Sequence, residues 1–376
     1  MRHRWLVVAA LALPAVLVAA GCGGSKKSSS SSGGKCDTPD NVTLQSKWVV
    51  QAQFAGYYAA LDKGYYKKRC LNVTIKPGGP DITPEQVVAS GQADFGIDWL
   101  PSLLATRDQG GNLVNIAQVF TRSGMTEITH KDSNISTIKQ MARKKVGVWC
   151  CGNQFELYAA LTKNGIDPNS KSAVTIVNQP FDMNLFLNRQ VDAAAAMTYN
   201  ELAQVLETKN PKTGKLYTLK DLNVIKMQSA GTAMLEDDVF VRGDWIKSKE
   251  NQDIAKRFLA ASFEGWAYCR DHYTECVDIV LAKGPTLPQG HQTWQMNEIN
   301  ALIWPAPKGI GVMDKAAFDR TAKIALDFKV IKKPASSDAY RTDLAKAAVD
   351  MVKDDGVDVN GNNWQKAEVK VTAGGK

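Results

Sequence analysis

Rings, carboxamides and carboxylates gather in segments that directly follow predicted strands, and this combination could bind a flat organic molecule. Trp48 follows the first predicted strand, and Asp98 and Trp99 follow the third. Ligands of open α/β sheets bind at the carboxyl ends of strands, and a planar heteroaromatic needs apolar faces on both sides and polar groups around its edge. We therefore predict a ligand site made of Trp48, Gln53, Phe54, Asp98, Trp99, Trp149, Cys150, Gly152, Asn153, Glu156, Asp182, Tyr199, Asn200 and Glu201.

Several of these side chains also fit purely structural roles. Trp48 and Trp99 could be core aromatics, since strand ends are often buried. Asp98 could cap the helix predicted from residue 102, although a carboxylate behind an apolar strand is costly unless it is paired. Glu156 and Glu201 fall in the first turns of predicted helices, where the helix dipole alone favours a negative charge.

The predicted site contains no arginine, and this bears on the charge of its ligand. A sulfonate or nitrate would need cationic or multiple N–H donors, whereas an exocyclic amine could donate to Asp98 or Glu201. The sequence has no Walker loop, HExxH helix or Ser/His/Asp order, and His272 lies between Cys269 and Cys276 without a fourth metal ligand. We expect a neutral or amine-bearing ligand, no catalytic residue and no metal.

The chain has seven cysteines, and six remain if Cys22 carries a lipid. An even number of cysteines can pair as disulfides, which is typical of a protein in an oxidising compartment. We predict two disulfides, one between Cys36 and Cys70 and one between Cys269 and Cys276. Cys150 and Cys151 are adjacent and form either free thiols or a strained vicinal disulfide.

The first residues have the pattern of a bacterial lipoprotein signal. Arg2 and Arg4 precede an apolar stretch over residues 6–20, and small residues lead to Cys22. We predict a signal peptide at 1–21, a lipidated Cys22 and a flexible Ser/Gly/Lys tether at 22–35. The alternative is an uncleaved membrane anchor. Both place the globular part outside the cytoplasm, on the outer face of the cell membrane or the periplasmic side.

The formal charge of +8 does not indicate a nucleic-acid partner. Arg2, Arg4, Lys26, Lys27 and Lys35 carry five of the positive charges, and all precede the globular part. No run of Lys and Arg with interleaved aromatics is present. We therefore expect no nucleic-acid binding.

Strands and helices are predicted to alternate along most of the chain. The predicted strands are 42–48, 71–76, 93–97, 114–120, 125–129, 145–149, 174–178, 193–197, 223–226 and 233–242, and the helices are 54–63, 84–90, 102–108, 138–143, 155–164, 185–188 and 201–207. Alternation predicts parallel sheets covered by helices on both faces. The pattern restarts after residue 124 and becomes helical over 245–352, which predicts lobe one at 36–124 and 226–376 and lobe two at 125–225. Two crossover strands near 121–130 and 226–235 would join the lobes as a hinged clamshell.

The order of several short segments resembles the solute-binding proteins related to sulfonate binders and thiamine pyrimidine synthases. The segments are Lys47-Trp48, Gln53-Phe54-Ala55-Gly56-Tyr57-Tyr58, Asp62-Lys63-Gly64-Tyr65-Tyr66, Gly91-Gln92-Ala93-Asp94-Phe95-Gly96, Lys145-Val146-Gly147-Val148, Leu187-Asn188-Arg189-Gln190-Val191-Asp192-Ala193 and Tyr199-Asn200-Glu201. The resemblance covers about residues 41–330. It implies an α/β type II periplasmic-binding-protein fold with the helical C-terminal part on lobe one. It also implies the monomeric binding subunit of an ABC importer, working with a permease and a separate ATPase, often for a thiamine-precursor pyrimidine.

The same resemblance leaves other functions open. Some relatives are thiamine pyrimidine synthases, in which an active-site histidine early in the first lobe is consumed and pyridoxal phosphate sits on a lysine. At the corresponding place after Trp48 this chain has Gln53-Phe54, and no histidine occurs between His3 and His130. We therefore expect a binding protein without enzymatic activity or a cofactor. Riboflavin-like flavins and sulfonate- or nitrate-type solutes are the alternative ligands.

Overall fold

The computed structural model describes residues 36, 38–150 and 152–376. Thr38–Lys376 form one compact unit. The predicted signal peptide, the lipidation site Cys22 and the tether lie outside the described residues. Within the described ranges, no helix is long and apolar enough to cross a membrane.

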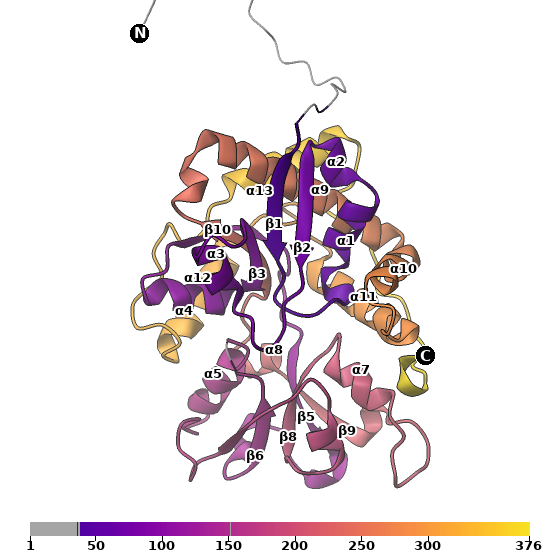
Figure 1. Cartoon of the computed structure of the whole chain (residues 1–376). Helices are drawn as coiled ribbons and strands as arrows, with labels where there is room; N and C mark the ends of the chain where they lie inside the picture. Colours follow the sequence, from indigo (N-terminus) through magenta and orange to yellow (C-terminus); the bar gives the residue numbers. More distant parts are fainter. Residues whose placement is uncertain (1–35, 37, 151) are drawn as a thin grey trace, which may run out of the picture. The chain divides into compact units, whose positions relative to one another are not determined.

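The compact unit contains two five-stranded sheets, which form the cores of two lobes (Figure 1). The lobe-one sheet consists, from edge to edge, of β2 (Leu71–Lys76), β1 (Asp40–Gln45), β3 (Phe95–Trp99), β10 (Asp237–Arg242) and β4 (Leu113–Gln118). Every residue of β3 is buried, as its central position requires. Gly96 in this strand makes room for a neighbouring ring, because a Cβ there would lie 2.3 Å from Cζ of Phe240.

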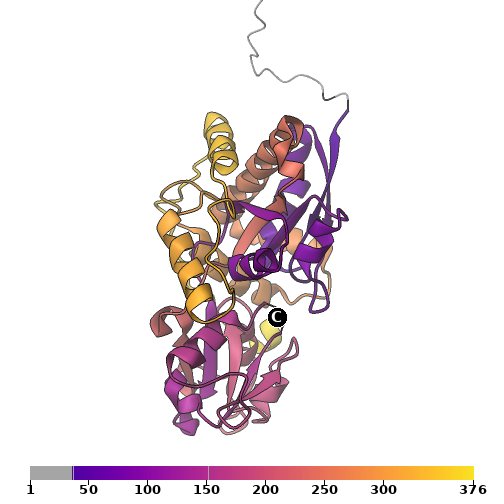
Figure 2. The ribbon, with the colours of Figure 1, turned by 90° about the vertical axis from the view of Figure 1, so that its left-hand side faces the viewer.

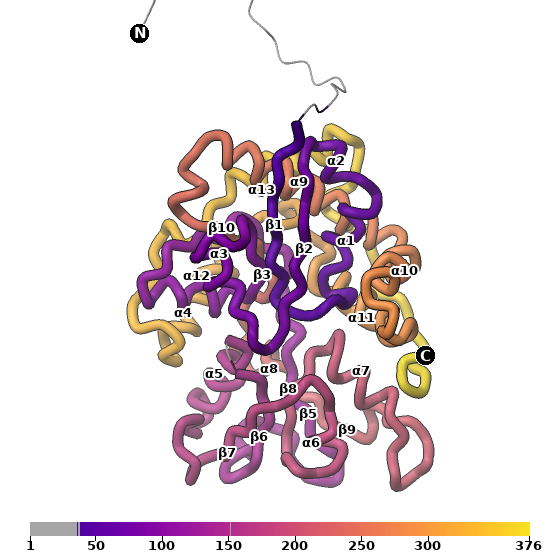
Figure 3. The backbone as a smooth tube through the Cα atoms, in the orientation of Figure 1, coloured from indigo at the N-terminus to yellow at the C-terminus, as the bar shows by residue number. Residues whose placement is uncertain are grey.

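The lobe-two sheet repeats the arrangement and is labelled most fully in Figure 3. Its strands, in spatial order, are β7 (Thr175–Asn178), β6 (Lys145–Val148), β8 (Ala193–Met197), β5 (Met125–His130) and β9 (Leu222–Lys226). Helices α5 (Phe155–Lys163), α6 (Asn184–Leu187) and α7 (Glu201–Leu206) connect or follow these strands. The segment predicted as a helix at 138–143 is a short 3-10 helix, η3 (Ile138–Met141).

The prediction that the sheets are parallel was wrong, since each contains one reversed strand. β10 runs antiparallel to β3 and β4, and β5 runs antiparallel to β8 and β9. These are the two strands that the chain enters after passing from the other lobe. The chain leaves one sheet at the carboxyl edge, which faces the other sheet. Its first strand in that other sheet therefore starts at the facing edge, where the neighbouring strands end, and runs antiparallel to them.

The chain passes between the lobes at residues 119–124 and again at 227–236, where it forms the short helix α8 (Met227–Ala230). Residues 233–236 were predicted to belong to the following strand, but they precede β10. Their amides bind elsewhere: Met234 N donates to Glu156 Oε1 at 2.9 Å, and Leu235 N donates to Thr321 Oγ1 at 3.1 Å. In this segment, side-chain oxygens therefore accept the amide hydrogen bonds that the carbonyl groups of a neighbouring strand would accept in a sheet.

Helices cover both sides of the lobe-one sheet. The first part of the chain supplies α1 (Ala55–Asp62), α2 (Tyr65–Lys68), α3 (Pro84–Ala89) and α4 (Leu100–Asp108), and the last part supplies α9 (Lys249–Asp271), α10 (Tyr273–Lys283), α11 (Gln289–Ile303), α12 (Lys315–Asp327) and α13 (Asp343–Asp354). Three C-terminal elements also reach lobe two: α12 packs on α5, and both α11 and the 3-10 helix η6 (Ala373–Gly375) pack on α7 (Figures 1 and 2).

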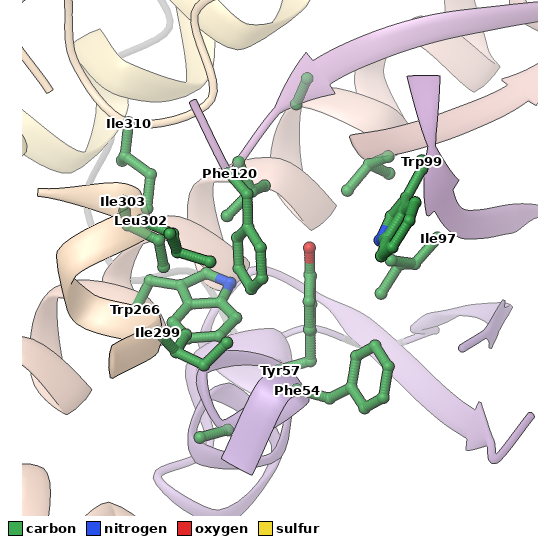
Figure 4. Close-up of a cluster of buried hydrophobic side chains, with 14 of the residues drawn as sticks. Phe54, Tyr57, Ile97, Trp99, Phe120, Trp266, Ile299, Leu302, Ile303 and Ile310 are labelled. Atoms are coloured by element: carbon green, nitrogen blue, oxygen red, sulfur yellow. The ribbon is translucent and has the colours of Figure 1, made fainter. Parts of the chain in front are cut away.

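The core of lobe one is built around aromatic rings between α1 and α9 (Figure 4). Tyr57 and Trp266 meet edge to face, with ring centroids 5.6 Å apart. Phe54 lies in the same cluster and is fully buried. The 3-10 helix η1 (Ala52–Phe54) precedes α1 and carries this ring into the core, so the first pocket loop is attached to the hydrophobic centre of its lobe.

Candidate ligand-binding site

A small pocket lies where the carboxyl ends of strands from both sheets meet. Lobe one contributes the loop after β1 and the end of β3, and lobe two contributes the loops after β6 and β8. The lining residues are Lys47, Trp48, Gln51, Gln53, Trp99, Trp149, Asn153, Met197, Tyr199, Asn200 and Glu201. The topology thus brings together loops that are up to about 150 residues apart in sequence.

The cavity volume is about 30 Å³, which is room for about two water molecules. Pockets that hold drug-sized ligands measure about 300–1,000 Å³. The two lobes are therefore closed upon each other in this structure. A ring compound could enter only if the lobes moved apart.

An aromatic contact joins the lobes beside the pocket. Trp48, on the loop after β1, meets Phe181, which lies between β7 and α6, with ring centroids 4.9 Å apart and planes at 64°. Phe181 is 42% exposed, which is unusual for so large an apolar side chain. Sequence analysis did not include Phe181, although it included the next residue, Asp182.

Asp98 does not line the pocket but fixes a cation that does. Its carboxylate forms a buried ion pair with Lys47 Nζ and accepts a hydrogen bond from Trp99 N at 2.6 Å. Lys47 Nζ also lies 5.0 Å from the centroid of the Trp99 ring. The alternative role of Asp98, a helix cap, is not observed: α4 begins at Leu100, and no side chain caps it.

Asp237 was missed by sequence analysis and holds two lining residues. Its carboxylate accepts hydrogen bonds from Gln53 Nε2 at 2.9 Å and from Trp99 Nε1 at 3.0 Å, and Gln51 Nε2 in turn donates to Gln53 Oε1 at 2.6 Å. Burial raises the pKa of Asp237 to about 7, against the opposing effect of the Gln53 hydrogen bond. The signal available in the sequence was an acidic residue at the start of an apolar strand, whereas Asp98 was selected because it follows an apolar strand.

Glu201 lines the pocket from lobe two. Its carboxylate accepts hydrogen bonds from Met197 N at 3.0 Å and from Asn200 Nδ2 at 2.7 Å. Burial raises its pKa to about 7. Because α7 begins at Glu201, the start of this helix presents the carboxyl group to the cavity.

Glu156 lies away from the pocket lining and binds both connections between the lobes. Its Oε2 accepts from Ser123 Oγ at 2.9 Å in the first connection, and its Oε1 accepts from Met234 N in the second. Burial raises the pKa of Glu156 to about 8. In the same place, Glu236 Oε1 accepts from Gly124 N at 2.6 Å, and burial followed by the charge of Glu156 raises the pKa of Glu236 well above its usual range.

The remaining predicted site residues surround the lobe-two side of the pocket or lie outside it. Asn153 lines the cavity and donates from Nδ2 to the carbonyl of Cys150 at 3.0 Å. Gly152 is buried at φ +109°, and a Cβ there would lie 2.2 Å from Ser102 Oγ of lobe one. Asp182 is exposed and accepts from Asn184 N at 2.8 Å at the start of α6. Neither Cys150 nor Asp182 lines the pocket.

The structure joins Cys269 and Cys276 by a disulfide between α9 and α10, with Cα atoms 5.3 Å apart. Cys36, Cys70 and Cys150 are also disulfide-bonded. In the described part of the chain, no group of three or more His, Cys, Asp or Glu side chains could hold a metal ion.

Two α/β lobes joined by two connections, with a pocket between the carboxyl ends of their strands, define a periplasmic-binding-protein fold. The sulfonate-binding protein SsuA of Escherichia coli superposes with a TM-score of 0.59 at 14% identity, covering 89% of this chain and 94% of SsuA. The nitrate-binding protein NrtA of Synechocystis superposes with a TM-score of 0.60 at 14% identity, covering 87% of this chain and 93% of NrtA. The type II fold that the resemblance implied is confirmed by these likenesses, which at such identity concern the fold alone.

The chain belongs to the NMT1/THI5-like family, whose model matches residues 51–275. This confirms the family resemblance. A Haemophilus influenzae protein named for thiamine biosynthesis is 25% identical over 168 residues, and the 4-amino-5-hydroxymethyl-2-methylpyrimidine phosphate synthase of Schizosaccharomyces pombe is 23% identical over 137 residues. The alignments cover 44% and 36% of this chain, but only 53% and 39% of those relatives. The riboflavin-binding protein RibY of Chloroflexus aurantiacus is 22% identical over 296 residues, which are 76% of this chain and 80% of RibY.

Proposed function

We propose that the protein is the extracytoplasmic binding subunit of an ABC importer and captures a small amine-bearing heteroaromatic, most directly an aminopyrimidine precursor of thiamine. The observation that carries the proposal is the composition of the pocket. Trp48, Trp99, Trp149 and Tyr199 bring four rings to one cavity, and Glu201 supplies a carboxyl group at its edge. Rings provide stacking faces for a planar ligand, and the carboxylate provides an acceptor for its amine.

The charges around the pocket favour an amine over an anion. Lys47 is the one cation among the described lining residues, and Asp98 already pairs with it. Asp237 and Glu201 add two further buried carboxyl groups. A sulfonate or nitrate would meet this acidic surface without an unpaired cationic partner, although proteins of similar fold bind such solutes.

Closure of the lobes would couple capture to delivery. A ligand that touches both lobes favours the closed state by its difference in binding free energy between the two states. The two connections and the Glu156 contacts that bind them form the hinge of this motion. The closed protein then presents its ligand to a membrane permease driven by a separate ATPase.

The same proposal includes secretion as a lipoprotein anchored through Cys22, and a monomeric state. Replacing Cys22 with Ser should abolish incorporation of a radiolabelled fatty acid and release the protein from the membrane fraction. A Cys22→Ser variant that stays labelled and membrane-bound contradicts the lipid anchor.

Thermal unfolding in the presence of candidate ligands tests the binding function. The probes are 4-amino-5-hydroxymethyl-2-methylpyrimidine, its formylamino analogue, thiamine, riboflavin and taurine. A ligand that binds only the folded state raises the unfolding temperature with concentration. We expect saturable stabilisation by the aminopyrimidines, and no effect of taurine. Stabilisation by taurine alone contradicts the proposed ligand class.

Riboflavin is the second candidate, favoured by the similarity to RibY along 76% of this chain. A flavin needs more space than a pyrimidine, so its binding requires wider separation of the lobes. Saturable stabilisation by riboflavin without any response to the pyrimidines selects this candidate.

In the synthase alternative, an active-site histidine is consumed in the reaction, so a peptide that contains it would become lighter. No histidine is among the described side chains that line the pocket, and this supports a binding protein. Incubation with pyridoxal phosphate and iron, followed by mass spectrometry of the peptides, tests the alternative. Loss of mass from any histidine identifies an enzyme.

A further inference from the structure

The first turn of α11 lies against both halves of the pocket. This helix belongs to the C-terminal part of the chain, packs on η1 in lobe one and on α7 in lobe two, and is in contact with η6. His291 and Gln292 are consecutive residues of this turn, and both are buried. Neither lines the cavity itself.

His291 bridges two residues of lobe two. Its Nδ1 lies 2.9 Å from Glu207 Oε1, and its Nε2 lies 2.8 Å from Asn200 Oδ1. The Asn200 amide directs its Nδ2 to the carboxylate of Glu201, so its oxygen faces the histidine and accepts from it. A continuous set of hydrogen bonds thus runs from Glu207 through His291 and Asn200 to the carboxyl group at the pocket edge.

Gln292 holds the opposite half of the pocket. Its Oε1 accepts a hydrogen bond from Ala52 N at 2.7 Å, and Ala52 lies between the lining residues Gln51 and Gln53. Adjacent side chains on one helical turn therefore hold the lobe-one loop and the lobe-two loop. Their spacing is fixed by the helix rather than by flexible loops.

Further contacts hold lobe two against the next turn of α11 and against η6. Trp294 Nε1 donates to the carbonyl of Thr198 at 2.9 Å, and Gly374 N donates to the carbonyl of Glu207 at 2.9 Å. Gly375 covers His291 closely, since a Cβ at Gly375 would lie 2.7 Å from the histidine Cβ. The imidazole is therefore largely removed from water, and hydrogen bonds are stronger there than at an exposed site.

We infer that His291 is a positioning residue of the ligand site. When the lobes close, it binds lobe two to the C-terminal helix α11 of lobe one and orients Asn200 and Glu201 toward the cavity. The inference rests on the proposed function, because it assigns to the binding site a residue outside its lining. His291 acts through Asn200 and needs no contact with the ligand.

The test uses the full chain with His291→Gln, which replaces the imidazole by a single terminal amide that cannot bridge Glu207 and Asn200 as the two ring nitrogens do. His272→Gln is the matched control, because the His272 side chain is 49% exposed and contacts Glu275 and Tyr268, which lie far from the pocket in sequence and outside its lining. Calorimetric titration with 4-amino-5-hydroxymethyl-2-methylpyrimidine should show binding about tenfold weaker or more for His291→Gln and unchanged binding for His272→Gln.

A double-mutant cycle separates positioning from general loss of stability. If His291 acts through Asn200 on Glu201, combining His291→Gln with Glu201→Gln should weaken binding by much less than the product of the two single effects. Independent effects that multiply, or an unchanged affinity of His291→Gln, overturn the inference.

Hydrogen exchange of the unliganded chain keeps the test independent of the ligand class. Peptides over residues 197–207 should exchange faster in His291→Gln than in the wild-type chain, whereas peptides over 71–76 should not change. If the pyrimidine does not bind the wild-type chain, the proposed ligand is wrong, and His291 is then judged by this exchange alone. Equal exchange of 197–207 in both chains overturns the inference.

Discussion

Trp48 is the aromatic side chain that most directly connects ligand stacking with closure. It lines the pocket and touches Phe181 of the other lobe. Trp48→Ala should weaken binding of the aminopyrimidine by about 0.5–1.5 kcal/mol beyond the loss of buried area. Calorimetry measures the change, and Leu219→Ala, at a residue that is 57% exposed, is the control. Unchanged affinity of Trp48→Ala removes Trp48 from the site.

Glu201 should make binding of an amine depend on pH. Burial raises the pKa of its carboxyl group to about 7, so the group gains its charge as the pH rises through neutrality. A ligand amine donates best to the charged form, and we expect affinity to increase between pH 6 and pH 8. Glu201→Gln should bind more weakly, by roughly tenfold, and lose this part of the pH dependence. Titrations at the two pH values measure both effects, and a pH profile that is the same in both chains contradicts the role of Glu201.

The helix pair α1 and α9 supports the pocket loop, and its close contact depends on glycine. A Cβ at Gly265 would lie 2.1 Å from the carbonyl oxygen of Gly56, which is backbone and cannot rotate away. Gly265→Ala should therefore reduce the free energy of unfolding by about 1–3 kcal/mol. Denaturant unfolding measures the loss. Gly79→Ala is the matched control, because a Cβ at Gly79 has no atom within 4 Å, and equal stability of both variants contradicts the packing argument.

Much of the element order could be predicted from the sequence, because strand and helix periodicity is local. The segment at 71–76 was predicted with the bounds that β2 has. The reversed strands β5 and β10 could not be predicted from that periodicity, because strand direction depends on where the chain returns from the other lobe.

Site residues that follow a strand were accessible to sequence analysis, and residues held by tertiary contacts were not. Trp149 and Tyr199 line the pocket and follow β6 and β8. Asp237 reaches the pocket residues because β10 is inserted beside β3, and His291 reaches Asn200 because α11 returns across both lobes. Neither relation has a signal in the local pattern, since it arises only from the packed topology.

The molecule as a whole holds several buried carboxyl groups between its lobes, so its stability should depend on pH in an unusual direction. Burial raises the pKa of Asp237 and Glu201 to about 7 and that of Glu156 to about 8. Each group binds its proton more tightly in the folded chain than in the unfolded chain, where glutamate has a pKa of about 4.3. Their contribution to stability is fully present below the unfolded pKa and is lost as the pH rises through the folded values.

Glu156→Gln isolates this effect at the hinge. The amide can accept from Met234 N and donate to Ser123 Oγ, so it replaces the protonated carboxyl group without a charge. We expect the variant and the wild-type chain to have similar free energies of unfolding at pH 5, and the variant to be more stable at pH 8.5 by an amount on the order of a few kcal/mol. Denaturant unfolding at both pH values measures the difference, with exposed Glu250→Gln as the control. A wild-type chain that gains stability relative to Glu156→Gln as the pH rises would show that Glu156 is held as a stabilised carboxylate. The hinge would then be tightened by charge, and the closed state would weaken in acid instead of in base.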